Sequence, residues 1–234
     1  MTQRAKIGCL GVFGIVVAFC VALGAGVVLW IHLSFPTASY RYRLTIAVES
    51  DGQVHSGSSV IEVNYRFYPS WFAGGTFERH LQGQAVLIRL GARGVLAAAL
   101  EYNIDRSVVG ANDLAIRAFD RGGRDYPTLR KSVEAIFLMR GPVDLTQDNM
   151  PAFIWFSDDN DPETAHLVKP QNFPAVIGDA TRVVSARLEI TRDPIIIDID
   201  EELPLYKKLR EDTLLLGDSV FLNRGMFIAS ESVK

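Results

Sequence analysis

The chain opens with a long apolar stretch that contains no charged side chain. No Asp, Glu, Lys or Arg occurs between Ile7 and Leu33. A helix over this stretch would reach roughly 40 Å, and the hydrocarbon core of a bilayer is about 30 Å thick. The pattern therefore predicts a transmembrane anchor over residues 7–33. A cleavable signal peptide is the alternative, because Ala22 and Gly24 could form a small-x-small cleavage site, although the apolar run continues past them.

After a short linker at residues 34–39, the pattern changes to strict alternation. Tyr42, Leu44, Ile46 and Val48 alternate with polar or small side chains, as in a strand with one buried face. Asp-Gly at 51–52 is a strong signal for a two-residue hairpin turn. We therefore expect a hairpin, with its return strand over 53–68.

The remaining pattern predicts short elements joined by polar turns. Residues 95–100 fit a strand or a helix equally well. Further strands are expected at 85–90, 150–156, 166–168 and 183–191, short helices at 113–119, 128–135 and 205–215, one helical turn within 170–178, and a last hairpin between 220–222 and 226–228. Together these elements predict one exported globular domain over residues 40–234. Its fold class is α+β and β-rich, mainly antiparallel, with a few short helices.

Charge and cysteine placement indicate how the chain crosses the membrane. Arg4 and Lys6 precede the apolar run, and every acidic residue lies beyond residue 40. A basic N-terminus favours residues 1–6 in the cytoplasm and the domain outside it. The whole chain has a net charge of −3, which argues against nucleic acid as a partner. Cys9 and Cys20 both lie in the apolar run, so the exported domain has no disulfide framework.

Small side chains recur every four residues along the predicted anchor. They are Gly14, Ala18, Ala22 and Gly26. On a helix they would form one stripe that permits close packing of a second membrane helix. The alternative is that Gly and Ala are simply frequent in membrane helices.

The sequence contains no recognised catalytic motif. It has no GxxxxGK[ST] phosphate loop, no HExxH and no GxSxG. Asp51, His55 and Ser59 suggest a triad, but on a strand His55 and Ser59 would lie about 13 Å apart. That spacing excludes direct proton transfer between them. We therefore expect no catalytic residue and no cofactor.

Two acidic clusters are the remaining candidates for chemistry. Asp158, Asp159, Asp161 and Glu163 are weak candidates for a cation site, since hard cations prefer oxygen ligands. The loop lacks the Gly and Glu positions of a calcium loop, and a polar turn is the alternative. Asp198 and Asp200 could act as a pair of catalytic carboxylates, or they could form a solvated segment before a helix.

Aromatic side chains gather around Pro69. The group comprises Phe67, Tyr68, Trp71, Phe72 and Phe77. It could dock on a membrane or a partner, or it could close one end of the core.

Several short motifs resemble a family of uncharacterised, single-span, membrane-anchored bacterial proteins. They are residues 40–45 (YRYRLT), residues 57–63 (GSSVIEV), Asn160-Asp161-Pro162, and residues 183–190 followed by Asp193-Pro194. The resemblance covers residues 40–194 with gaps, and the family has no known activity. It implies an anchored domain in the bacterial envelope.

These observations give one expectation about function and two alternatives. We expect a single-pass protein of the bacterial inner membrane with a periplasmic C-terminal domain. Residues 7–33 would contact the lipid bilayer, and the domain would be a non-catalytic module that binds a membrane or periplasmic protein. The alternatives are a ligand- or ion-sensing domain and a hydrolase with an unrecognised site.

Overall fold

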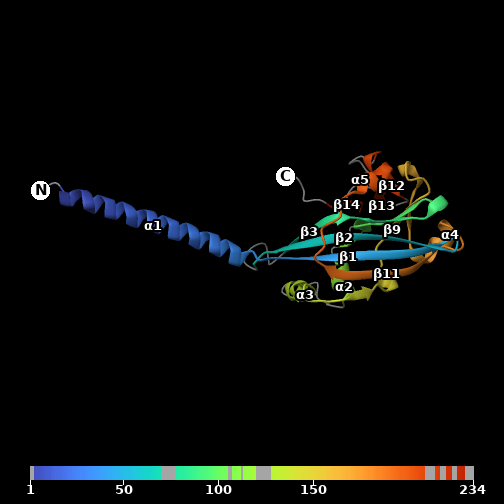
Figure 1. Ribbon diagram of the computed structural model, residues 1–234, viewed down its shortest axis with the longest axis horizontal. Helices are drawn as coiled ribbons and strands as arrows, with labels where there is room; N and C mark the ends of the chain where they lie inside the picture. Colours follow the sequence, from blue (N-terminus) through green and yellow to red (C-terminus); the bar gives the residue numbers. More distant parts are fainter. Residues whose placement is uncertain are drawn as a thin grey trace. The chain divides into compact units, whose positions relative to one another are not determined.

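The computed structural model describes residues 3–69, 77–104, 107–111, 113–119, 128–208, 214–216, 220–222 and 226–229. The chain divides into two compact units. The first comprises residues 1–37 and 66–78, and the second, called here the β domain, comprises residues 38–65 and 79–234. Figure 1 shows the elements in chain order by colour.

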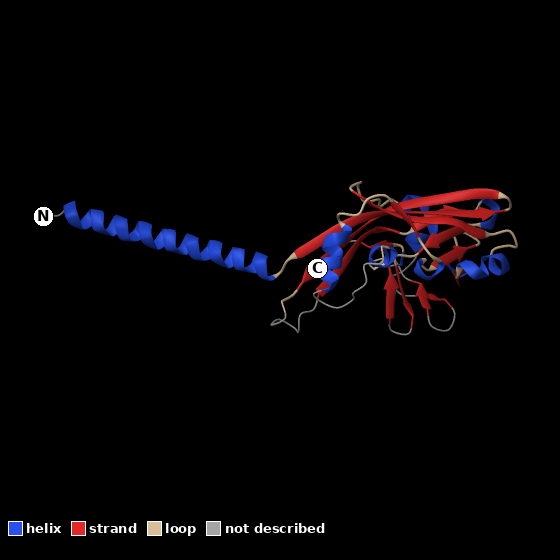
Figure 2. Cartoon of the chain, turned by 90° about the horizontal axis from the view of Figure 1, so that it is seen from below, coloured by secondary structure: helices blue, strands red, loops and turns tan. Residues whose placement is uncertain are grey.

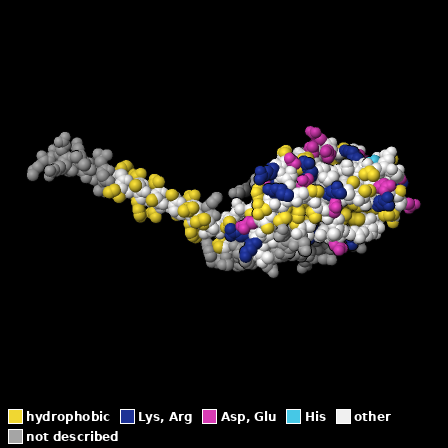
Figure 3. Space-filling model, turned by 60° about the horizontal axis from the view of Figure 1, so that its bottom comes forward, with side chains coloured by type: hydrophobic (Ala, Val, Ile, Leu, Met, Phe, Trp, Pro, Cys, Tyr) yellow, Lys and Arg dark blue, Asp and Glu magenta, His cyan; other side chains and the backbone are white. Residues whose placement is uncertain are grey.

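The first unit contains α1 (Gln3–Ser34), a helix of 32 residues. Its apolar side chains are exposed, as Figure 3 shows along the part whose side chains are described. By length and composition, Phe13–Trp30 could cross a membrane, either as an anchor or as part of a signal sequence. The same unit holds the segment after α1, where Phe67 N donates a hydrogen bond to Pro36 O.

A six-stranded sheet forms most of the β domain, and its strand order is β14-β3-β2-β1-β11-β8. Its strands are β1 (Thr37–Ser50), β2 (Gln53–Phe67), β3 (Phe77–Gln84), β8 (Pro142–Asp144), β11 (Arg182–Thr191) and β14 (Ile228–Ala229). Tyr42, Leu44, Ile46 and Val48 are fully buried, as the alternation predicts. β1 with β11, β11 with β8, and β14 with β3 all pair in antiparallel orientation.

The β1–β2 hairpin has the predicted two-residue turn. Asp51 and Gly52 have φ values of 52° and 77°. Positive φ at both central positions is the type I′ pattern that matches the twist of the flanking strands. Arg93 donates two hydrogen bonds of 2.8 Å to the Asp51 carboxylate in this turn, and these bonds lower the pKa of Asp51.

A second sheet has four strands in the order β10-β9-β5-β4. They are β4 (Val86–Arg89), β5 (Val95–Ala98), β9 (Phe153–Phe156) and β10 (Ala165–Val168). One face of this sheet packs against α5 (Ile199–Glu202), the 3₁₀ helix η5 (Pro204–Lys208) and Phe227. The sheet is nearly all apolar because both of its faces are covered.

The two sheets meet where β2 approaches β4. A Cβ atom at Gly57 would collide with the carbonyl group of Leu87. Figure 2 shows the long strands as one layer with shorter strands on one side of it. The absence of a side chain at Gly57 therefore sets how closely the two sheets can approach.

The remaining elements are short. Two separate hairpins are formed by β6 (Glu101–Ile104) with β7 (Ser107–Gly110), and by β12 (Leu214–Leu216) with β13 (Val220–Leu222). The helices are α2 (Leu114–Ala118), α3 (Thr128–Ile136) and α4 (Phe173–Val176), and the other 3₁₀ turns are η1 (Gly91–Arg93), η2 (Gln147–Asn149), η3 (Pro162–Thr164) and η4 (Pro170–Asn172).

The α+β, β-rich fold class predicted from the sequence is confirmed, as are most of the strands and short helices. The linker is shorter than predicted, because β1 begins at Thr37. Residues 95–98 form a strand, which resolves the ambiguity there. The strands β3, β6, β7 and β8 were not foreseen, because their alternation is weak or their length is only three or four residues.

The prediction for the C-terminal part is wrong in two respects. Residues 205–215 do not form one helix: η5 ends at Lys208, and residues 214–216 form β12. The predicted hairpin between 220–222 and 226–228 is also wrong, because β13 pairs with β12 and β14 pairs with β3. Both errors arise because short apolar segments take the structure of whichever partner they pack against.

Candidate functional site

The acidic loop between β9 and β10 satisfies its own polar groups. Asp158 Oδ1 accepts a hydrogen bond of 2.9 Å from Asn160 N, and Asp161 Oδ1 accepts one of 3.0 Å from Glu163 N at the start of η3. Asp159 pairs with Arg89 at 2.9 Å. Within the described part of the chain, no group of three His, Cys, Asp or Glu side chains could hold a metal ion. The loop has the geometry of successive Asx turns.

Asp51 and Ser59 of the suggested triad have other partners. Asp51 is held by Arg93. Ser59 is buried, and its Oγ donates a hydrogen bond of 2.8 Å to Gln84 O. A serine whose hydroxyl proton is given to a backbone carbonyl is not available to a histidine base.

Asp198 is bound to a buried glutamine. Gln84 Nε2 donates to the Asp198 carboxylate, and Asp198 N donates to Gln84 Oε1, both at 2.6 Å. The pKa of Glu202 is raised, mainly by burial and further by the charge of Asp198. Asp198 thus fixes the start of α5 to the end of β3. The side chain of Asp200 lies outside the described residues, so its pairing with Asp198 stays a prediction.

Part of the aromatic group around Pro69 closes the first unit. Phe67 is fully buried, and its ring centroid lies 6.3 Å from that of Phe77. The rings of Tyr68 and Phe35 meet edge to face at 5.8 Å. Trp71 and Phe72 lie outside the described residues. The described members of the group therefore pack with one another.

On α1, the glycines of the small-residue stripe face open space. A Cβ atom added at Gly14 or Gly26 would meet nothing within 4 Å. Ala18 and Ala22 lie between them on the same helix and are exposed. Pairing of this stripe with a second helix stays a prediction.

Three tyrosines lie side by side in the core of the β domain. Tyr40, Tyr42 and Tyr65 are at most 2% exposed, and the rings of Tyr40 and Tyr65 stack at 6.2 Å. Burial raises the pKa of all three phenols above 10. Tyr42 Oη donates a hydrogen bond of 2.7 Å to Ala111 O. These phenols are inaccessible to a substrate and serve packing.

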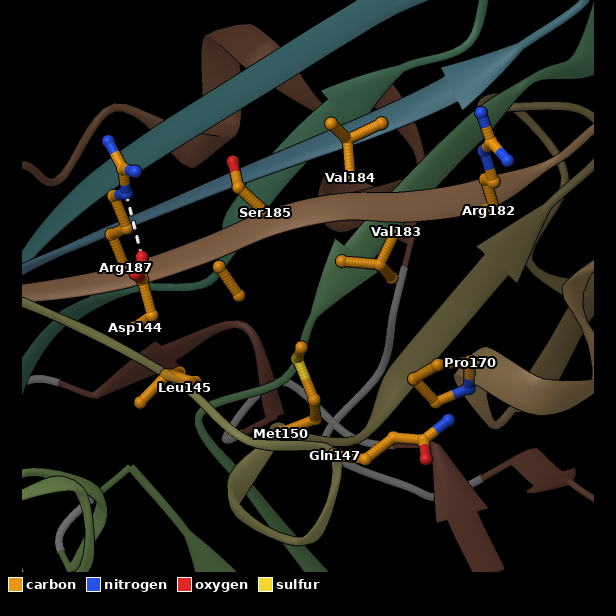
Figure 4. Close-up of a pocket in the computed structure, with 11 residues that line it drawn as sticks. Asp144, Leu145, Gln147, Met150, Pro170, Arg182, Val183, Val184, Ser185 and Arg187 are labelled. Carbon is orange, nitrogen blue, oxygen red and sulfur yellow. Dashed lines mark hydrogen bonds and ion pairs between the residues drawn. The ribbon is translucent and has the colours of Figure 1, made fainter.

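A concavity runs along β11 (Figure 4). Its volume is about 400 Å³. A smaller cavity of about 190 Å³ shares Gln147, Met150 and Pro170 with it. The lining comes from β11 together with the chain after β8 and the start of η4: Asp144, Leu145, Gln147, Met150, Pro170 and residues 182–187. We call it the β11 cleft.

The β11 cleft exists because β8 covers only part of β11. The pairs between these strands run from Arg187 with Asp144 to Glu189 with Pro142, and Leu145 N donates to Ala186 O. Beyond Leu145 the chain turns away into η2. Among the described strands, residues 182–185 are therefore flanked by β1 on one edge and by no strand on the other edge.

Charged pairs stand at the two ends of the cleft. Arg187 Nε lies 2.7 Å from Asp144, and Arg182 lies 2.7 Å from Glu49. The side chains of Arg182 and Arg187 are 73% and 60% exposed. Such exposed pairs contribute little stability, so either guanidinium can exchange its partner for another carboxylate at small cost.

The sequence did not single out the β11 cleft. Residues 183–190 were recognised as a strand, but nothing in their alternation tells which stretch lacks a neighbour. A comparison of the chain with models of known protein families, with curated proteins and with solved structures finds no match. The resemblance to single-span, membrane-anchored bacterial proteins thus stays a prediction, and the case for function rests on α1 and the β11 cleft.

Proposed function

We propose that this chain is a single-pass membrane protein whose β domain binds an extended segment of a partner protein in the β11 cleft. The observation that carries the proposal is the incomplete pairing of β11, which leaves residues 182–185 beside an open cleft. In this proposal α1 is an uncleaved anchor, the β domain lies outside the cytoplasm, and its role is not catalytic.

The lining of the cleft suits an extended peptide. Neighbouring residues of a regular strand point to opposite faces, yet Ser185, Ala186 and Arg187 all line the cleft. The cleft therefore follows the edge of β11 rather than one face of the sheet. Exposed strand edges bind extended segments by main-chain hydrogen bonds, with side-chain pockets supplying selectivity.

A β-bulge shapes the same stretch of edge. In the register of β1 with β11, Val183 lies opposite Val48 and Ser185 lies opposite Ala47. Val184 is the extra residue, and it is 52% exposed. A bulge blunts a strand edge against nonspecific pairing. The edge is thus protected from indiscriminate association, while Val184 offers an apolar contact to a matching segment.

Photocrosslinking of the full-length chain in its native membrane tests the proposal. A photoreactive phenylalanine analogue replaces Val184 in the cleft, and in a control chain it replaces Val54, which is 64% exposed on β2 outside the cleft. We expect a discrete adduct from position 184, and we expect Val184→Asp to abolish the same adduct when the probe stands at Met150.

Three outcomes would contradict the proposal. Equal adducts from positions 184 and 54 would mean nonspecific contact, and no adduct from 184 or 150 would mean an unoccupied cleft. The adduct's second component must also be mapped to one contiguous segment. Crosslinks scattered over a folded partner would indicate a face-to-face interface instead of an extended peptide.

A further inference from the structure

An apolar turn follows α3 and is exposed. Phe137 and Leu138 are 46% and 68% exposed, whereas Ile136, the last residue of the helix, is fully buried. The turn is well tied, because Leu138 N donates to Ala135 O at 3.1 Å. Arg140 Nη1 donates to Phe137 O at 3.2 Å and to Met139 O at 2.8 Å. Two adjacent large apolar side chains are therefore held in solvent by a fixed backbone.

Two cations flank this turn, and among the described residues neither has an acidic partner. Arg140 bonds to carbonyl oxygens, and the guanidinium of Arg192 lies 5.8 Å from the centre of the Phe137 ring. No ion pair involves Arg140 or Arg192 in the part of the chain that the structure describes. The carboxylates closest in sequence are already engaged, since Asp144 pairs with Arg187 and Asp193 pairs with Arg43.

The turn lies at the end of the β domain from which the chain leads back to α1. Arg192 directly follows Thr191, and Thr191 pairs with Arg41 near the start of β1. Figure 1 places α3 at the end of the domain where β1 begins. Arg41 is only seven positions after Ser34, the last residue of α1, and an extended chain over seven positions spans at most about 25 Å.

We propose that Phe137 and Leu138 insert into the headgroup layer of the bilayer that holds α1, and that Arg140 and Arg192 bind the phosphates of anionic phospholipids there. This inference rests on the proposed role of α1 as an anchor. Apolar side chains flanked by Arg are the chemistry that holds peripheral segments at a membrane surface. Basic side chains near an anionic membrane surface are attracted to it electrostatically.

The size of the patch favours lipid over a protein partner. A stable protein interface buries at least about 1,000 Å² with a continuous apolar centre, whereas two apolar side chains beside Arg140 and Arg192 offer far less. A bilayer needs no shape complementarity. It also stands within covalent reach of this end of the domain, so the effective concentration of its headgroups is high.

Depth-dependent fluorescence quenching of the full-length chain tests the proposal. Cys9 and Cys20 are replaced by Ser, and an environment-sensitive fluorophore is attached at Leu138→Cys. The matched control carries the fluorophore at Val54→Cys, which is as exposed as Leu138 but lies near the β1–β2 turn, about 30 Å along the strand from Arg41. Both chains are reconstituted into vesicles of phosphatidylcholine with and without phosphatidylglycerol, containing lipids brominated at a shallow acyl position.

We expect the probe at 138 to shift its emission to the blue and to be quenched several-fold more strongly than the probe at 54. Adding phosphatidylglycerol should increase that difference. The double substitution Arg140→Gln and Arg192→Gln should remove the increase, while its melting temperature reports whether the domain stays folded. Equal, weak quenching at both positions would overturn the inference, as would quenching independent of anionic lipid in the unsubstituted chain.

Flotation of the same vesicles separates this inference from the proposed function. If the chain does not float with the vesicles, α1 is not an anchor and both proposals fail. If the chain floats but the probe at 138 stays in water, the lipid contact alone is wrong. A probe at 138 that is shielded in native membranes but stays in water in vesicles that contain no other protein would show that a partner protein, not lipid, covers the turn.

Discussion

Single residues decide how tightly the β domain packs, and Gly57 is the clearest case. Any side chain at this position meets the backbone of Leu87 in the neighbouring sheet. A backbone atom cannot rotate away as a flexible side chain can. The strand pattern around Gly57 indicates neither the collision nor the partner, because Leu87 is thirty positions away.

We predict that Gly57→Ala destabilises the β domain by about 2 kcal/mol or more, since overpacking a close contact costs about 1–3 kcal/mol. Ser56→Ala is the matched control: Ser56 is the exposed neighbour on the same strand and should change stability by less than about 0.5 kcal/mol. Urea unfolding of the chain in detergent measures both. Equal stability of the two variants would mean that the sheets can separate at no cost.

The buried phenols make the stability of the domain depend on alkaline pH. The pKa values of Tyr40, Tyr42 and Tyr65 are raised by burial in the folded state, whereas an unfolded tyrosine ionises near pH 10. Their contribution to stability is therefore fully present below about pH 10 and is lost as pH rises through the folded pKa values.

We expect three of the seven tyrosines to resist ionisation in the folded chain between pH 10 and 11 and to ionise on unfolding in urea. Phenolate absorbance at fixed pH measures this directly. Tyr42→Phe should reduce the loss of stability per pH unit in that range. Ordinary titration of every tyrosine in the folded chain would contradict the packing described here.

At the scale of elements, one polar contact fixes the segment that covers the second sheet. Gln84 at the end of β3 is 2% exposed and exchanges two hydrogen bonds with Asp198 at the start of α5. Ile199 and Leu203 then pack on the four-stranded sheet. The acidic segment 198–202 thus forms the start of a short helix, and the amide of Gln84 holds it in place.

We predict that Gln84→Met, which keeps the volume but removes both hydrogen bonds, destabilises the chain by about 1–3 kcal/mol. Asp198→Asn keeps the backbone donor and an acceptor oxygen, so its effect should be smaller. Thermal unfolding in detergent compares the two variants. If Gln84→Met is neutral, water replaces the amide and α5 does not depend on it.

At the scale of the whole molecule, α1 is the element that could attach the chain to a membrane. The helix is long enough to span a bilayer, and its described side chains are exposed. A signal sequence would meet the same description. The two possibilities differ in whether the mature chain keeps residues 1–33, and a membrane attachment that survives washing requires that it does.

We predict that the membrane-bound chain has its full intact mass and resists extraction by alkaline carbonate. Val21→Asp places a charge in the middle of the helix at a cost of about 3 kcal/mol, so it should lower the fraction inserted, whereas Val21→Leu should not. Mass spectrometry and fractionation report both properties. A soluble chain that begins after residues 22–24 would show that α1 is a cleaved signal.

What the sequence by itself determined is what local physics controls. A long uncharged run predicts a membrane-spanning helix because bilayer thickness alone sets its length. Alternation over residues 41–49 predicts β1, and Asp51-Gly52 predicts its turn, because a few consecutive side chains decide both. Residues 113–119 and 128–135 were expected as short helices on the same local grounds, and α2 and α3 confirm them.

What only the tertiary structure decided depends on residues far apart in the chain. The pairing of β14 with β3 joins positions about 145 residues apart. The sequence of a short apolar segment does not indicate which distant strand it pairs with. The β11 cleft arises where β8 stops pairing, which the alternation in β11 cannot reveal. The exposure of Phe137 and Leu138 is equally nonlocal, because a side chain is buried only when another element covers it.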